Sequence, residues 1–284
     1  MTESISPLVS EEITLSVDHV SVFVRAWRPV SSPRAIVAIS HGFNAHGGLY
    51  TRAAEQLVAA GYAVYAVDLR GRGRSSGPRF TITRFDDYVA DIAAMIALAR
   101  QRDQDLPLYL LGHSAGGVAA CLYTIDHPFG LQGLICESFA FRLPAPAIAL
   151  ALVRLLSHVA PRAPVLRLKN EDFSRDLEWI AHLNADPLIA GETQPAITVA
   201  ALIRAGTRLG RDFSHVTTPI LILHGTADRA TQPSGSQQLY EMAGSKDKTL
   251  RLYEGAYHDL LSDIGRDAVM RDILSWLAQR VPAA

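Results

Sequence analysis

Short apolar runs alternate with amphipathic stretches along most of this chain, and this rhythm limits the folds it can adopt. Ala35–Ile39 is an uninterrupted apolar run rich in β-branched residues, as expected for a strand buried on both faces. Such alternation predicts an α/β fold: a mostly parallel sheet with helices on both faces. The other strands expected are Tyr62–Val67, Leu108–Leu111, Leu131–Cys136, Ile220–His224 and Thr249–Tyr253; the helices expected are Leu49–Ala60, Phe85–Arg100, Gly116–Asp126, Ser236–Ala243 and Asp267–Gln279.

Two segments depart from this rhythm. Ile13–Val17 and Val20–Trp27 alternate apolar and polar residues, which predicts a β-hairpin. Residues 139–213 are rich in Pro, Ala and Leu and mostly helical by pattern, and they are too long for a structureless loop. We therefore expect a core domain made of residues 1–138 and 214–284, with residues 139–213 inserted as a mostly helical cap, or lid.

Composition narrows the function and the setting of the protein. The 284 residues include 27 basic and 28 acidic ones, a net charge of −1, which argues against a nucleic-acid binder and against a polybasic membrane anchor. Cys121 and Cys136 lie in apolar stretches and are expected to be buried free thiols. Met1–Glu12 has no apolar core of a signal peptide, and Leu143–Val153 is too short to span a membrane. We expect a soluble protein of the reducing cytoplasm.

The sharpest motif is Gly112-His113-Ser114-Ala115-Gly116, which lies between an expected strand and an expected helix. In this setting a G-x-S-x-G sequence makes a sharp, strained turn that lifts the serine hydroxyl above the carboxyl edge of the sheet. The helix behind it begins at the same point, and a helix N-terminus favours developing negative charge. Ser114 is therefore the candidate nucleophile.

A serine hydroxyl needs a base to remove its proton. His258 lies in a polar loop directly after the last expected strand, which places it at the same sheet edge as Ser114. Among the other histidines, His41 and His224 end strands, where we expect them to shape loops.

The imidazole in turn needs an acid to orient it. Asp228 follows the strand Ile220–His224 and is the candidate, whereas Asp259 adjoins His258 and is badly placed to reach the ring of its own neighbour. The chain order Ser114, Asp228, His258 is the one expected after a nucleophile turn of this type.

Acyl transfer also requires donors for the oxyanion. We expect the backbone N–H of Ala115, directly after the nucleophile, and that of Phe43, in the loop after Ala35–Ile39, to supply them. Phe43, Asn44, His113 and Leu150 are the residues expected to contact substrate. No metal and no cofactor is required by this chemistry.

These motifs resemble the α/β-hydrolase fold and, within it, the monoacylglycerol lipase and lysophospholipase group. The resemblance implies an inserted lid and a Ser-Asp-His triad. Family members commonly carry an acid and an arginine that place the glycerol end of the substrate, and this chain has Ala45 and Leu49 at those positions. The matching segments are His41-Gly42, the run 68–75 from Asp68 to Ser75, the Ser114 turn, the run 184–188 from Asn184 to Leu188, the run 224–236 from His224 to Ser236, and the run 252–258 from Leu252 to His258.

The sequence therefore predicts a serine hydrolase of carboxylic esters, similar to monoacylglycerol lipases or lysophospholipases. The run Pro144–Leu156 carries a single charge, Arg154. Its apolar face either packs on the core or forms an acyl-chain channel with a patch that touches membranes or micelles. Three alternatives are a general carboxylesterase for aryl or small alkyl esters, an enzyme that cleaves an amide or C–C bond, and a receptor that keeps the fold without turnover.

Overall fold

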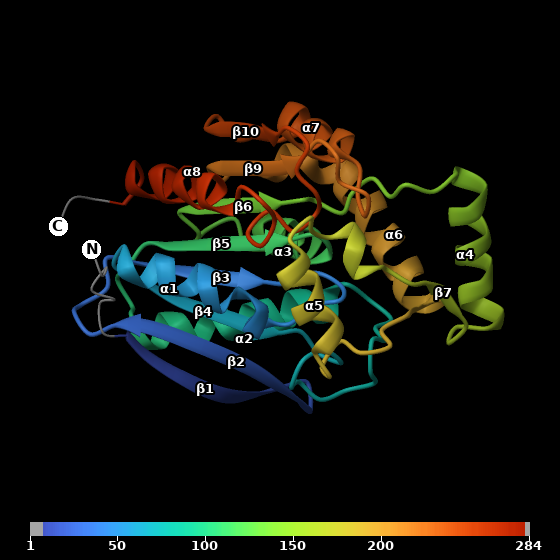
Figure 1. The fold of residues 1–284 in the computed structure, drawn as a ribbon, viewed down its shortest axis with the longest axis horizontal. Helices are drawn as coiled ribbons and strands as arrows, with labels where there is room; N and C mark the ends of the chain where they lie inside the picture. Colours follow the sequence, from blue (N-terminus) through green and yellow to red (C-terminus); the bar gives the residue numbers. More distant parts are fainter. Residues whose placement is uncertain (1–7, 282–284) are drawn as a thin grey trace.

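One mixed sheet organises the protein in the computed structural model, which describes residues 8–281 (Figure 1). Its eight strands run in the order β1-β2-β4-β3-β5-β6-β9-β10. From β4 to β10 all neighbours are parallel, and only the pairs β1/β2 and β2/β4 are antiparallel. The mostly parallel sheet expected from the apolar runs is therefore confirmed. The strands are β1 Leu8–Val17, β2 Val20–Pro29, β3 Ala35–Ser40, β4 Tyr62–Asp68, β5 Leu108–His113, β6 Gly133–Glu137, β9 Ile220–Gly225 and β10 Lys248–Tyr253.

Helices cover both faces of the sheet and create two apolar layers. Helices α1 (Thr51–Ala59) and α8 (Arg266–Ala278) pack on one face, where Leu57 and Trp276 are buried. Helices α2 (Asp86–Arg102), α3 (Ala115–Asp126) and α7 (Pro233–Met242) pack on the other. Strands β3 to β6 are buried along their whole length because both of their faces meet helices, which explains their uninterrupted apolar sequences.

The N-terminal hairpin is also confirmed. Strands β1 and β2 pair in register from Leu8 opposite Pro29 to Val17 opposite Val20. The two residues between them, Asp18 and His19, have φ of 49° and 66°, as a two-residue hairpin turn that follows the twist of the strands requires. Strand β1 forms the edge of the sheet, and its outer residues are exposed.

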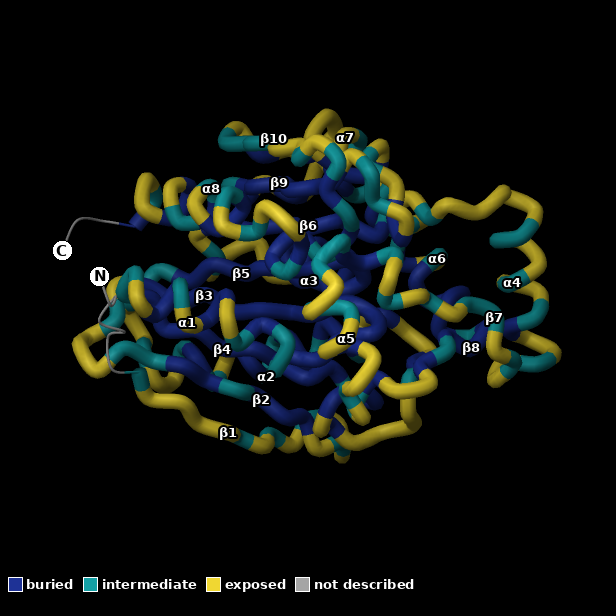
Figure 2. The backbone as a smooth tube through the Cα atoms, viewed as in Figure 1, coloured by how far each residue is buried: buried dark blue, intermediate teal, exposed yellow. Residues whose placement is uncertain are grey.

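The stretch between β6 and β9 is mostly helical, in agreement with its pattern. Its longest helix, α6, buries one face in the apolar layer beside α3, whereas α4 lies farther out and is largely exposed (Figure 2). The division into a core and a cap at residues 139–213 remains a prediction. The elements are α4 Ala147–Val159, β7 Pro164–Leu166, the 3₁₀ turns η2 Asn170–Asp172 and η3 Phe213–His215, α5 Leu177–Ala185, β8 Gln194–Pro195 and α6 Ala196–Asp212; a further turn, η1 Gly47–Tyr50, precedes α1.

The structure also describes the two cysteines and the lengths of the apolar helices. Cys121 and Cys136 are buried and unlinked, with their sulfur atoms 3.5 Å apart, as expected for free thiols. Within residues 8–281 no helix is long and apolar enough to cross a membrane. Residues 1–7 of the segment inspected for a signal peptide lie outside the described residues.

Candidate active site

Ser114 occupies a strained turn between β5 and α3. Its φ of 55° and ψ of −119° are unfavourable for a residue with a side chain, and such strain persists only where the surrounding packing enforces it. The packing here is tight because a Cβ at Gly116 would lie 2.3 Å from the carbonyl oxygen of His41, and one at Gly112 would lie 2.7 Å from Ala120 Cβ. The two glycines therefore let the backbone of the turn pass close to its neighbours, as expected for G-x-S-x-G.

Asp228 and His258, expected to meet at the same sheet edge, are in direct contact. The imidazole Nδ1 of His258 lies 2.8 Å from Asp228 Oδ2, and both side chains are almost fully buried. The Ser114 hydroxyl forms no hydrogen bond with His258 among residues 8–281. In free enzymes such contacts are often longer than in the substrate complex.

The Asp228 carboxylate accepts an unusually complete set of hydrogen bonds. Burial by itself would raise the pKa of Asp228, but the nearby His258 imidazole and the hydrogen bonds from His224 and His258 outweigh it, so the pKa lies well below its ordinary value. Asp228 is therefore ionised at all physiological pH values. The donors are the N–H groups of Ala230 (2.8 Å) and Thr231 (2.9 Å), the Thr231 hydroxyl (2.8 Å), His224 Nε2 (3.0 Å) and His258 Nδ1 (2.8 Å).

The contact between His224 and Asp228 was missed by the sequence analysis, which expected His224 only to shape a loop. Its Nδ1 lies 2.7 Å from the Ser236 hydroxyl, which donates a hydrogen bond when Nε2 carries the proton. The Nε2–H group then donates to Asp228. The sequence signal was the spacing of four residues between His224 and Asp228, but only the turn after β9 brings the two side chains together.

The loop after β3 presses directly on the nucleophile. A Cβ at Gly42 would lie 2.7 Å from Ser114 Cβ and 3.2 Å from its Oγ. His41 supports this loop: Leu69 N–H donates to its Nε2 at 3.0 Å, so Nδ1 carries the proton and donates to the carbonyl of Gly42 at 2.7 Å. Among residues 8–281, the backbone N–H of Phe43 has no hydrogen-bond acceptor. It is therefore available to donate to an oxyanion, as the predicted role requires.

Ala115, the other expected donor, is buried at the first position of α3, where backbone N–H groups have no partner within the helix. Its N–H has no acceptor elsewhere in the part of the chain that the structure describes. The positions of Phe43 and Ala115 next to Ser114 are thus those that oxyanion stabilisation needs. Their role remains a prediction.

A cavity of about 300 Å³ opens beside the nucleophile. The cavity is lined by Ser114, Ala115 and Phe43, and on its apolar side by Leu150 and Val153 of α4. Phe43 and Leu150 thus lie where a substrate-contacting residue is expected. Further lining residues are Leu143, Val165, Leu166, Leu168, Val199 and Leu202.

Asn44 and His113, the other two expected substrate contacts, line a different cavity of about 210 Å³. The His113 ring packs on the His258 ring, with centroids 4.8 Å apart. The second cavity is also lined by Ala45 and Leu49, the two positions at which the family resemblance implies an acid and an arginine. The four predicted substrate contacts are therefore divided between two neighbouring cavities.

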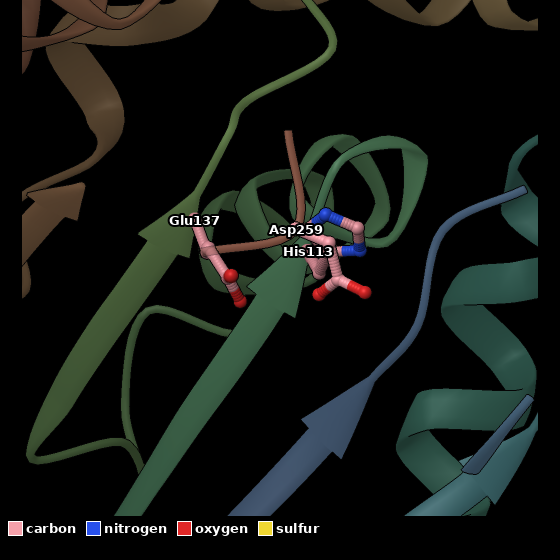
Figure 3. A group of neighbouring side chains, drawn as sticks. All are labelled: His113, Glu137 and Asp259. Carbon is pink, nitrogen blue, oxygen red and sulfur yellow. The ribbon is translucent and has the colours of Figure 1, made fainter. Parts of the chain in front are cut away.

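Three titratable groups meet behind the site: His113 at the end of β5 and Glu137 at the end of β6, both buried, and the partly buried Asp259 in the loop after β10 (Figure 3). Burial lowers the pKa of His113 to about 3 and raises the pKa of Asp259 to about 6. Burial, and then repulsion from Asp259, raise the pKa of Glu137 well above its usual value. The possible ligand atoms of the three side chains lie within 4.8 Å of one another. Protonation of Glu137 removes the charge repulsion that would otherwise oppose this close approach. We therefore assign no metal to the cluster.

The sheet order, the strained serine turn and the Asp228–His258 contact define the class of protein as an α/β-hydrolase. Comparison with known proteins agrees. Residues 31–265 match the family described as "Serine aminopeptidase, S33", and the chain belongs to this family.

Its relatives point to ester hydrolysis. The chain is 31% identical to a monoacylglycerol lipase of Mycolicibacterium smegmatis, over 98% of this chain and the whole of the relative. It is also 31% identical to human monoglyceride lipase, over 95% of this chain and 91% of the relative. The crystal structure of Paleococcus ferrophilus monoacylglycerol lipase superposes with a TM-score of 0.80 at 27% identity, over 96% of this chain and 99% of that one. The chain is thus a serine ester hydrolase similar to monoacylglycerol lipases, and the comparisons do not favour the alternatives considered above.

We expect the His224→Leu variant to lose about tenfold in kcat on p-nitrophenyl butyrate. Leucine cannot donate to the buried Asp228 carboxylate, and a hydrogen bond to a charged group contributes about 1.5–3 kcal/mol. His224→Gln retains an N–H donor and should keep most of the activity. The exposed His215→Leu is the control. Equal kcat in the Leu variant and the wild type would contradict a role for His224 in orienting the acid.

We expect the Asp259→Asn variant to gain stability relative to the wild type as the pH rises. The folded-state pKa of about 6 lies above the ordinary value of 3.8, so the folded protein binds the proton more tightly than the unfolded chain does. The wild type therefore loses stability between about pH 4 and pH 6, and the loss is complete above that range. Because Asp259 is only partly buried, we expect an effect on the order of 1–2 kcal/mol.

Thermal unfolding of both proteins at pH 4.5 and at pH 8 measures this difference. Asp267→Asn, at an aspartate whose side chain is 65% exposed, is the matched control and should show no such pH dependence. If the difference in melting temperature between Asp259→Asn and wild type is the same at both pH values, the raised pKa of Asp259 is wrong.

Proposed function

We propose that this protein hydrolyses lipid-like carboxylic esters, with monoacylglycerols as the substrate class, and that Ser114, His258 and Asp228 are its catalytic triad. The single observation that carries the proposal is the joint geometry at the sheet edge. A strained serine after β5 lies beside two backbone N–H groups that have no acceptor among residues 8–281, and a buried Asp-His pair comes from the loops after β9 and β10. The relatives named above support the substrate class.

In the first half of the reaction, Ser114 Oγ attacks the carbonyl carbon of the ester. Because the Nδ1–H group of His258 donates a hydrogen bond to Asp228, Nε2 carries the lone pair that accepts the serine proton. The oxyanion receives hydrogen bonds from the N–H groups of Phe43 and Ala115. When the tetrahedral intermediate collapses, His258 returns the proton to the departing alcohol, and an acyl-Ser114 ester remains.

In the second half, a water molecule gives a proton to His258 Nε2 and attacks the acyl carbon. The same donors hold the second oxyanion, and collapse releases the carboxylic acid while His258 returns the proton to Ser114. Asp228 stays ionised throughout and stabilises the imidazolium that forms twice in each cycle. The reaction consumes one water and needs no redox step.

The acyl chain fits the apolar cavity beside Ser114. Each buried methylene contributes about 0.8 kcal/mol, so a medium or long chain gains considerable binding energy there. The alcohol side meets Ala45 and Leu49 rather than an acid and an arginine, so we propose that acyl-chain burial dominates recognition. From composition we also propose a cytoplasmic location.

We further propose that α4 touches membrane or micelle surfaces. Ile148, Leu152, Leu155 and Val159 recur on one face of the helix and are 60–73% exposed, while Arg154 is turned aside to the Thr207 hydroxyl. An exposed apolar stripe of this kind is typical of helices that lie in a lipid interface. Contact there would place the cavity entrance near the lipid that the enzyme cleaves.

We expect Ser114→Ala to reduce hydrolysis of a p-nitrophenyl ester series from C2 to C12 by at least a thousandfold. It should also abolish labelling by a fluorophosphonate probe. In the wild type, kcat/KM should rise with chain length until the cavity is filled. The control is Ser10→Ala, at an exposed serine of the edge strand β1. Persistent hydrolysis or labelling in folded Ser114→Ala would refute the assignment of the nucleophile.

We expect the double variant Ile148→Ser/Leu155→Ser to bind phosphatidylcholine vesicles at least fivefold more weakly in a sedimentation assay. Hydrolysis of soluble p-nitrophenyl butyrate should stay unchanged because both side chains face away from the cavity. Val9→Ser/Val30→Ser removes two exposed apolar side chains elsewhere and is the control. Equal vesicle binding by all three proteins would rule out this surface.

A further inference from the structure

A fully buried ion pair joins the core of the protein to the segment between β6 and β9. Arg72 follows β4, and Glu192 precedes β8; their side chains are 0% and 1% exposed, and an Arg72 Nη1–Glu192 Oε1 contact links them. Arg72 also donates from Nε to the Tyr88 hydroxyl at 2.7 Å and from Nη2 to Gln194 Oε1 at 2.8 Å. Glu192 Oε1 also accepts a hydrogen bond from Gln194 Nε2 at 2.5 Å.

Both members of this pair hold the loop that carries the oxyanion donor. The guanidinium carbon of Arg72 lies 4.3 Å from the centre of the Phe43 ring, a cation–π distance. Glu192 Oε1 accepts the backbone N–H of Asn44 at 2.9 Å. Phe43 is therefore held through its ring and through the peptide group that follows it.

The opposite side of the same residue is held by the nucleophile turn. Gly42 lies so close to Ser114 that even a methyl group at Gly42 would collide with it, and the His41 imidazole binds the Gly42 carbonyl. The peptide group that carries the Phe43 N–H is thus held at its carbonyl by His41, beside Ser114, and the next peptide group is held by Glu192. A small movement of either anchor turns this N–H away from the reacting carbonyl.

The energetics also point to positioning. A buried ion pair loses the hydration of both charges, and replacing such a pair with apolar residues often leaves stability unchanged or improves it. Here a single carboxylate oxygen, Glu192 Oε1, accepts hydrogen bonds from Arg72, from Gln194 and from the backbone N–H of Asn44. Donors placed before the reaction begins are those that lower the barrier, because they need no reorganisation.

We propose that Arg72 and Glu192 are positioning residues that hold the Phe43 N–H in the oxyanion hole. Through Glu192, the segment between β6 and β9 takes part in transition-state stabilisation without touching the substrate. This inference rests on the proposed function, since it assigns a supporting role in the same hydrolytic reaction.

The test uses the full chain with Glu192→Gln, which keeps the side-chain shape and an acceptor oxygen but removes the charge. We expect kcat on p-nitrophenyl butyrate to fall 10- to 100-fold with KM within twofold of wild type. Affinity for a trifluoromethyl ketone, which forms a tetrahedral adduct on the serine, should fall in parallel with kcat, whereas affinity for the carboxylic acid product should not change. Glu192→Asp, which keeps the charge, should recover part of kcat.

Arg28→Met provides the matched control because it breaks another ion pair, Arg28–Asp103, away from the oxyanion loop. It should lower the melting temperature and leave kcat and ketone affinity unchanged. If Glu192→Gln lowers the melting temperature like Arg28→Met and keeps wild-type kcat and ketone affinity, the positioning role is wrong.

A second variant, Phe43→Leu, decides the matter if Glu192→Gln does not fold, because it removes the ring beneath Arg72 and keeps the backbone N–H. Since this ring also lines the cavity beside Ser114, affinity for the carboxylic acid product is measured alongside and should not change. We expect this variant to lower kcat and ketone affinity together, and unchanged values would overturn the proposal. Failure of the hydrolase assignment itself gives a different result: wild-type protein then neither turns over esters nor reacts with a fluorophosphonate.

Discussion

The active edge of this protein depends on the close approach of two backbone turns. Strands β3 and β5 are direct neighbours, with Ser40 opposite Gly112, so the loops that follow them must share the same small space. Gly42, Gly112 and Gly116 make this approach sterically feasible. The resulting compression holds Ser114 at positive φ and places the oxyanion loop against it. A Cβ at Gly42 or Gly116 would push the two turns apart and move the loop after β3 away from Ser114.

Around this contact the protein buries several charges, and each is stabilised in a different way. Asp228 stays ionised because five donors, two of them imidazoles, surround it. Glu192 is balanced by the Arg72 guanidinium. Glu137 pairs with no Lys or Arg among residues 8–281, and burial favours its protonated form. The three carboxyl groups thus make three different contacts: Asp228 with two imidazoles, Glu192 with a guanidinium and the loop after β3, and Glu137 with the backbone N–H of Leu261.

The sequence predicted the sheet and the hairpin well because each depends on a local pattern, and patterns of the same kind singled out the triad candidates. An apolar run such as Ala35–Ile39 is diagnostic of a strand covered on both faces, and a turn such as Asp18-His19 is set by neighbouring residues. The assignment of Asp228 and His258 followed from their positions after consecutive strands, since parallel strands end at one edge. Their 2.8 Å contact agrees with that argument.

Other parts of the site could not be found in this way. The contacts of Glu192 with Arg72 and Asn44 join residues 120 and 148 positions apart, and no spacing rule predicts them. The separation of Asn44 and His113 from the cavity beside Ser114 depends on how the segment between β6 and β9 packs on the sheet edge. The exposed stripe of α4 was likewise open to two interpretations, because an apolar helix face has the same sequence whether it meets protein or lipid.

The sequence by itself determined the α/β architecture and the strained serine turn, and it singled out Ser114, Asp228 and His258 as candidate reacting side chains. It could do so because backbone propensity and hydrophobic period act over short stretches of chain. Only the tertiary structure decided which groups hold those side chains in place: His224 on Asp228, and Arg72 with Glu192 on the oxyanion loop. These are contacts between buried polar groups from distant segments. Buried polar groups gain partners of this kind only once the chain has folded, and no local pattern specifies them.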